Sequence, residues 1–163
     1  MGVPEDPVMQ SDSGRPRPAR TRVSDEAAAD IARETLRSTG VIPIEPDPPI
    51  AVVLAPGERV LTVRHAARVV SLAPVDDKRV ADAGDLYLTD RRLVLADSPL
   101  DVALEDIREV GIVDGELLLL VDRSGGVRIH IDDPRVFRVE ISAARSAHRV
   151  SCGSRSAGQV DSR

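Results

Sequence analysis

The stretch Gly84-Asp-Leu-Tyr-Leu-Thr-Asp-Arg-Arg-Leu-Val-Leu95 decides the fold of this 163-residue chain. Apolar residues gather at Leu86–Leu88 and Leu93–Leu95, and a polar Thr-Asp-Arg-Arg corner separates them. This pattern predicts two short strands joined at a tight turn. Because Thr and Asp side chains hydrogen-bond nearby backbone groups, Thr89 and Asp90 are expected to fix that turn.

The corner ends in two adjacent arginines. Neighbouring residues of a strand point to opposite faces, so Arg91 and Arg92 are expected to leave the corner in opposite directions. One of them is expected to pair with a carboxylate such as Asp85 or Asp106. This interpretation, a turn with a surface ion pair, is favoured over the alternative that either arginine binds a ligand.

Composition and charge restrict the partners of the protein. Tyr87 and Phe137 are its only aromatic residues, so the core is aliphatic and no platform for stacking bases can form. The formal net charge of -5 argues against nucleic-acid binding and against broad adhesion to anionic membranes, since both need excess cations. We therefore expect no nucleic-acid partner.

Targeting signals are absent from the sequence. The single cysteine, Cys152, excludes an intramolecular disulfide. No apolar run is long enough for a membrane-spanning helix, and the N-terminus lacks the basic start and apolar stretch of a signal peptide. These features predict a cytoplasmic protein, with peripheral association with a membrane as the alternative.

The flanking segments differ from the middle of the chain. Residues 1–23 mix prolines with arginines without apolar periodicity, which predicts a disordered tail. Residues 24–39 carry a narrow apolar stripe at helical spacing, with Ser24 as the N-cap. The prolines of residues 40–50 predict a stiff, extended linker. Residues 149–163, containing Ser, Gly and Arg, are predicted to form a second disordered tail.

Residues 51–148 predict one domain of six to seven short antiparallel strands and a closing helix. Asp114-Gly115 is the strongest hairpin signal, because a type I′ turn needs positive φ at both central residues. Leu117–Val121 is continuously apolar and is predicted to be the most buried strand. Residues 73–84 are polar and are predicted to form a loop.

The spacing of apolar residues becomes helical near the end of this domain. Asp133 can cap a helix that begins at Pro134, where the missing N–H of proline costs nothing. Phe137 falls on the apolar face of this helix, and Arg145 falls on the opposite face. A bent antiparallel sheet or partly open barrel, closed at one end by the helix, would bury that apolar face. The predicted fold class is therefore mainly β (β+α).

This order of elements resembles the bacterial pleckstrin-homology-like (PH-like) and GRAM-like domains over about residues 52–147. The similarity rests on the Leu54-Ala-Pro-Gly-Glu58 opening before a strand, on the hairpin quoted above, and on the Asp-Pro-x-x-Phe start of the closing helix. The resemblance implies a PH-like fold whose signature residues here are Gly57, Glu58, Gly84, Tyr87, Thr89, Asp90, Arg92, Pro134 and Phe137.

The chain also departs from these families. Eukaryotic members carry a Trp in the closing helix, whereas this chain has none, and Phe137 is expected to take a comparable place. Phosphoinositide-binding members carry several basic residues around the first hairpin. Arg64 and Arg68 are the candidates here, but three aspartates in the following loop oppose them, so phosphoinositide binding is not inferred. These two residues, with Arg91 and Arg92, are the candidate contacts to a ligand or partner.

No catalytic arrangement is evident in the sequence. The three histidines are scattered, and none stands at metal-ligand spacing from another histidine or from Cys152. Cys152 and His148 lack the oriented third group that an activated nucleophile needs. We therefore expect a non-catalytic module with no cofactor and no metal. The favoured function is binding of a protein or peptide partner, the alternative is a peripheral membrane or lipid-binding module, and the oligomeric state stays open.

Overall fold

A computed structural model describes residues 20–72, 81–122 and 125–156 of the chain. Within these ranges it contains one antiparallel sheet of seven strands in the order β4-β3-β2-β1-β7-β6-β5. The strands are Val60–Ser71 (β1), Ala81–Thr89 (β2), Arg92–Leu95 (β3), Asp101–Ala103 (β4), Ile107–Val113 (β5), Glu116–Val121 (β6) and Gly125–His130 (β7). The helices are Arg20–Thr39 (α1), Pro48–Ala51 (α2) and Pro134–Ser156 (α3).

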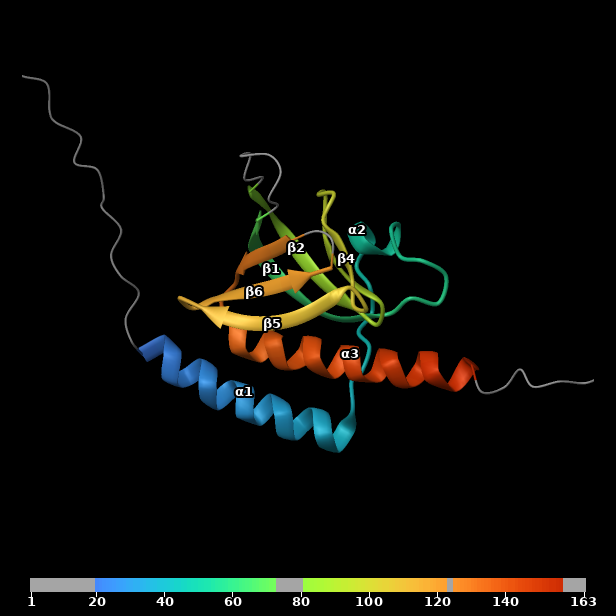
Figure 1. The fold of residues 1–163 in the computed structure, drawn as a ribbon, viewed down its shortest axis with the longest axis horizontal. Coiled ribbons are helices and arrows are strands. Elements are labelled where there is room, and N and C mark those ends of the chain that lie inside the picture. Colours follow the sequence, from blue (N-terminus) through green and yellow to red (C-terminus); the bar gives the residue numbers. More distant parts are fainter. Residues whose placement is uncertain (1–19, 73–80, 123–124, 157–163) are drawn as a thin grey trace, which may run out of the picture.

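The sheet bends around a single large apolar core, and α3 runs along one open side of it (Figure 1). Phe137, Ile141 and Ala144 of α3 are each no more than 1% exposed and pack into this core. The sheet does not close, because β4 and β5 are its two edges. This mainly β arrangement with a closing helix confirms the predicted fold class and is consistent with a PH-like fold.

Strand β1 links the two halves of the sheet, because it pairs with both β2 and β7. Its register with β2 shifts between Arg64 and Ala67. Ala66 in this bulge has a φ of 53°, which is uncommon for a residue with a Cβ, and its N–H donates to the Asp85 carboxylate at 3.3 Å. The extra residue reverses the alternation of side chains, so Arg64 and Arg68 lie on opposite faces of the sheet.

The hairpin of β2 and β3 forms as the sequence predicts, with Leu86 paired to Leu95 and Leu88 to Leu93. It is buried on both faces, which the sequence does not show. The prediction that Leu117–Val121 is the most buried strand is wrong, because Leu120 in β6 is 42% exposed. The Asp114-Gly115 turn is confirmed, since both residues have positive φ, 54° and 82°.

The segment that contains α2 covers the outer face of the β2–β3 hairpin. Ile50 of α2 is 1% exposed and packs with Tyr87 and Val94 in a second apolar cluster. The Tyr87 hydroxyl donates to the Asp47 carboxylate at 2.8 Å. The prediction that residues 40–50 form only an extended linker is therefore wrong, because the end of this segment is helical and part of a core.

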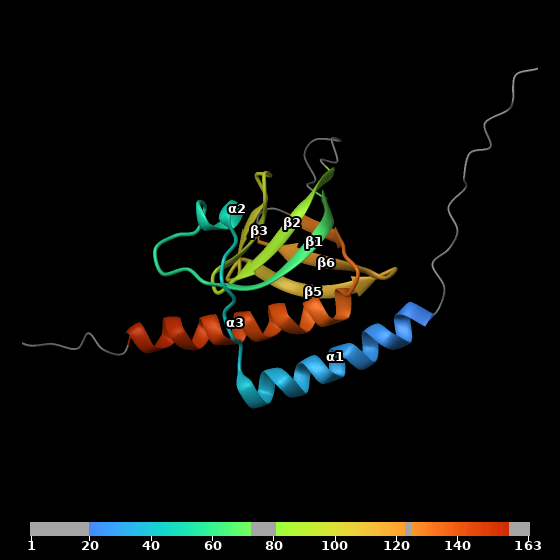
Figure 2. The same ribbon diagram turned by 180° about the vertical axis from the view of Figure 1, so that it is seen from behind.

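Helix α1 lies against α3 on the side away from the sheet (Figure 2). Asp25 of α1 is 7% exposed, and its carboxylate accepts the backbone N–H of Arg135 in the first turn of α3 at 3.3 Å. Glu26 forms an ion pair with the Arg135 guanidinium at 3.0 Å. Asp133 lies at the N-cap position as predicted, since its backbone carbonyl accepts the Phe137 N–H at 3.0 Å, and a carboxylate from another helix also serves the first turn of α3.

Several predicted boundaries need correction. Helix α1 begins at Arg20 rather than Ser24, so residues 20–23 are not part of a disordered tail. Helix α3 continues to Ser156, so residues 149–156 are helical rather than disordered. Strand β2 begins at Ala81, inside the predicted loop. Residues 1–19, 73–80 and 157–163 of the predicted tails and loop lie outside the described ranges. Arg145 was expected to face away from the sheet, but its guanidinium donates to the Ile107 carbonyl.

Candidate functional site

The polar corner of the hairpin is tied to the turn before β1 by a buried ion pair. The Glu58 side chain is 0% exposed, and it accepts hydrogen bonds from the Arg92 Nε at 2.9 Å and from the Thr89 hydroxyl at 2.7 Å. Its other oxygen accepts the Ala55 N–H at 2.8 Å and the Arg92 Nη2 at 3.0 Å. Gly57, with a φ of 73°, permits the tight turn that points Glu58 inward.

These contacts determine the charge state of the ion pair. Burial alone would raise the pKa of the Glu58 carboxyl, but the hydrogen bonds from Arg92, Ala55 and Thr89 outweigh it and lower that pKa. The hydrogen bond to Glu58 raises the pKa of Arg92, and Asp101 adds to this. The expected ion pair therefore exists, but the predicted partners, Asp85 and Asp106, are wrong.

The remaining corner residues also make internal contacts. The Asp90 carboxylate accepts the backbone N–H of Arg59 at 3.1 Å and its Nε at 3.0 Å. Arg91 is exposed, and its guanidinium donates to the Pro56 carbonyl at 3.2 Å. The Thr89 hydroxyl accepts the N–H groups of Arg91 and Arg92 at 3.1 and 2.9 Å, as expected for the residue that fixes the turn. The polar groups of the corner thus form hydrogen bonds within the protein and connect the β2–β3 hairpin to the turn before β1.

The structure separates the two arginines of β1. Arg64 lies on the inner side, where its guanidinium is 5.0 Å from the Phe137 ring centroid and 2.7 Å from Glu140 of α3. Burial raises the pKa of the Glu140 carboxyl, although Arg64 opposes this. Arg68 lies on the outer side and is exposed, and no carboxylate among the described residues pairs with it. Of the four candidate arginines, Arg68 alone faces a surface that no other segment of the described residues covers.

This surface, the open sheet face, is the outer side of β1, β7, β6 and β5. The strand registers place its residues in three cross-strand rows, one charged and two mainly apolar. The row nearest the β5–β6 turn contains Arg68, His130, Glu116 and Val113. The second row contains Val70, Arg128, Leu118 and Gly111. The third row contains Leu72, Gly126, Leu120 and Glu109.

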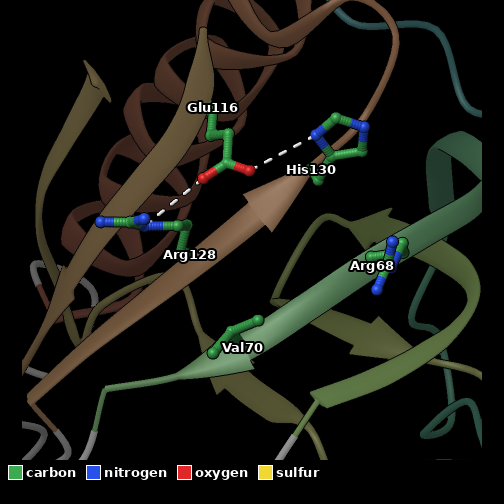
Figure 3. Close-up of a pocket in the computed structure, with 5 residues that line it drawn as sticks. All are labelled: Arg68, Val70, Glu116, Arg128 and His130. Carbon is green, nitrogen blue, oxygen red and sulfur yellow. Dashed lines mark ion pairs between the residues drawn. The ribbon is translucent and has the colours of Figure 1, made fainter. Parts of the chain in front are cut away.

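The charged end of the open sheet face surrounds a shallow hollow of about 270 Å³ lined by Arg68, Val70, Glu116, Arg128 and His130. Figure 3 shows Glu116 between Arg128 and His130, while Arg68 stands apart on β1. Each ion pair of Glu116, with the Arg128 Nε and with the His130 Nδ1, measures 3.4 Å. Arg128 and His130 therefore share one carboxylate, and Arg68 pairs with no carboxylate among the described residues.

Sequence reasoning identified Arg68 but missed its neighbours in the hollow. Arg128 and His130 alternate with buried residues of β7, so the sequence places them on the outer face of that strand. It does not show that β7 lies beside β1, because that pairing joins residues about sixty positions apart. The alternation of exposed and buried residues in β7 could have identified Arg128 and His130 as outer-face residues. Only the strand order shows that they lie beside Arg68.

The described residues contain no cluster of side chains typical of a metal centre. No group of three or more His, Cys, Asp or Glu side chains in the described ranges could hold a metal ion. Among the described helices, none has the length and apolar character that crossing a membrane requires. A scan against models of known protein families finds no match for this chain, and a search of curated proteins finds no similar sequence.

Proposed function

We propose that this chain is a non-catalytic interaction module of the PH-like or GRAM-like kind, which binds a protein or peptide partner through the open sheet face. A cytoplasmic location and the absence of a cofactor belong to the same proposal. The difference between the two halves of the sheet is the observation that supports it. The outer side of one half is covered by the segment that contains α2, whereas no segment within residues 20–72, 81–122 and 125–156 covers the outer side of the other.

The covered half shows what an outer face of this sheet requires. Tyr87 and Val94 are 2% and 8% exposed because Ile50 and its neighbours pack over them. On the open sheet face, Leu120 and Val113 are each 42% exposed, and the described residues provide no segment that packs over them. Apolar side chains on an exposed sheet, bordered by charges, are typical of a protein-binding surface.

A partner segment could also use the edge of the same half. Strand β5 is an outer strand of the sheet, so one side of its backbone has no strand partner, although α3 packs against β5 and Arg145 donates to the Ile107 carbonyl at its start. An extended peptide can add to such an edge through main-chain hydrogen bonds, while side chains on the adjoining face provide specificity. The open sheet face and the β5 edge together give a partner both kinds of contact.

Affinity purification from the source cell with matched variants tests the proposal. Leu120→Glu places a charge on the open sheet face at an exposed position. Ile31→Glu is the control, because Ile31 is 68% exposed but lies on α1. We expect a partner that the wild type and Ile31→Glu recover equally and that Leu120→Glu loses. Equal recovery by all three proteins would place the interface elsewhere and contradict the proposal.

The alternative function is peripheral membrane binding, and the cations of the hollow are the observation that favours it. Co-sedimentation with vesicles of phosphatidylserine and phosphatidylcholine at low salt tests this alternative, because electrostatic screening is then weakest. Binding that disappears in Arg68→Glu would support the membrane alternative. Failure to sediment under these conditions would remove it.

A further inference from the structure

We propose that Arg68, Arg128 and His130 form a subsite for a carboxylate of the partner, and that the partner is a linear segment with an acidic residue close to an aliphatic one. This inference rests on the proposed function and specifies the chemistry of the same surface. It follows from the charge balance of the hollow and from the spacing of the rows.

The charge balance favours an anion in the hollow. Arg68 is directly opposite His130 in the sheet register, and Arg128 is in the next row. Glu116 provides the neighbouring carboxylate, at 3.4 Å from both Arg128 and His130, while Arg68 has no acidic partner among the described residues. An incoming carboxylate would pair with Arg68 and share Arg128, forming charge-assisted hydrogen bonds that the free protein lacks.

The spacing of the rows favours an aliphatic residue beside that carboxylate. Successive rows are two residues apart, about 6.6 Å along a strand, and neighbouring strands are about 4.8 Å apart. Leu118 lies beside Arg128 on the neighbouring strand, and Leu120 lies one row further on. By these spacings the two leucines lie about 5 and 8 Å from Arg128 and about 12 and 16 Å from Arg68, distances that two to five residues of extended peptide span.

The net charge of the protein does not oppose this assignment. The chain carries -5 overall, but charges farther away than about 8 Å are largely screened at physiological ionic strength. Local charges therefore dominate at the hollow. A membrane is a weaker candidate, because Glu109 and Glu116 on the same face would approach its anionic headgroups.

Selection of displayed random linear heptapeptides on the immobilised full-length protein tests the subsite. The wild type is compared with Arg68→Glu, and Arg37→Glu on α1, whose side chain is 73% exposed, is the control for charge alone. We expect the wild type and Arg37→Glu to enrich peptides that combine Asp or Glu with Leu, Ile or Val within four residues. Arg68→Glu is expected to lose them and to favour basic peptides.

An enriched peptide is then measured in solution against the same proteins. We expect Arg68→Glu to weaken binding of the peptide at least about tenfold. Replacing the acidic residue of the peptide by the corresponding amide should weaken binding to a similar extent, because either change removes a charge-assisted contact. Circular dichroism spectra of the variants show whether each is folded.

The other outcomes separate this inference from the proposed function. Enriched peptides without acidic residues, or peptides that Arg68→Glu still binds, would overturn the subsite but leave the interaction module standing. Failure to enrich any heptapeptide would overturn both for linear partners. Vesicles of phosphatidylserine that sediment the wild type but not Arg68→Glu would assign the cations to a membrane and overturn the peptide assignment.

Discussion

The ion pair between Glu58 and Arg92 gives the sharpest prediction for stability. Glu58→Gln keeps the shape of the side chain but replaces a carboxylate oxygen by an NH2 group. This group faces donors, because Thr89, Ala55 and two nitrogens of Arg92 all donate to the two oxygens of Glu58. The change leaves at least one buried donor unpaired and deprives Arg92 of its buried counter-charge.

The size of the effect follows from this geometry. Removing one partner of a buried pair costs about 3–5 kcal/mol, because the remaining charge loses its partner without regaining water. Arg92 keeps Asp101 and the Val53 carbonyl, which favours the lower end of that range. We therefore expect Glu58→Gln to lower the free energy of unfolding by about 3 kcal/mol, which for a domain of this size is about 12 °C or more in Tm.

The matched control is Glu34→Gln on α1. Glu34 also pairs with an arginine, Arg37, but at 3.4 Å and with both side chains more than 70% exposed. Exposed pairs contribute about 0–1 kcal/mol, so this variant should unfold like the wild type. Urea unfolding followed by far-ultraviolet circular dichroism at pH 7 measures all three proteins. A loss of less than about 1 kcal/mol in Glu58→Gln would refute the reasoning from a buried pair.

Three further predictions concern other parts of the molecule. Burial raises the pKa of Tyr87 to about 12, and because Tyr87 is the only tyrosine, absorbance at alkaline pH should report its ionisation alone. The neutral form of Tyr87 stabilises the fold fully at pH values below the ordinary tyrosine pKa of 10.0, and this stabilisation is lost as the pH rises toward 12. An absorbance midpoint near pH 10 in the folded protein would contradict the raised pKa. Asp25→Asn should weaken the docking of α1 by about 1 kcal/mol, and hydrogen exchange in α1 should quicken while exchange in the sheet stays unchanged. Ala66 and Gly115 both have positive φ. Ala66→Gly should therefore stabilise the protein by about 0.5–1 kcal/mol, and Gly115→Ala should destabilise it by a similar amount. Thermal unfolding measures both variants, and a stability change of the same sign in both would count against this account.

Local features of the fold could be predicted because neighbouring residues determine them. The hairpin of β2 and β3, the Asp114-Gly115 turn and the amphipathic start of α3 all follow from spacing within a few residues. Thr89 fixes the corner as predicted, because its hydroxyl reaches N–H groups two and three residues away. Patterns of this range need no knowledge of strand order.

Features that depend on distant contacts could not be predicted. Glu58 pairs with Arg92 across 34 residues, so the sequence pointed to closer carboxylates instead. Ile50 belongs to a core because Tyr87 lies beneath it, whereas its local sequence, rich in prolines, is typical of a linker. The hollow on the open sheet face combines residues from β1, β6 and β7, and only the observed strand order brings them together.

The bulge in β1 gives this strand one residue more than its pairing with β2 requires. The residues before the bulge pair with β2, and those after it also pair with β7. Arg64 pairs with Leu86 and Ala67 with Gly84, so two residues of β1 lie opposite the one residue between these partners. Deleting Ala66 would remove the bulge but leave Ala67 facing the core and Arg68 facing outward, because the pairing on either side of the bulge is unchanged. A family of natural variants is therefore expected to tolerate the loss of one residue between Arg64 and Ala67, since both faces of β1 keep their side chains.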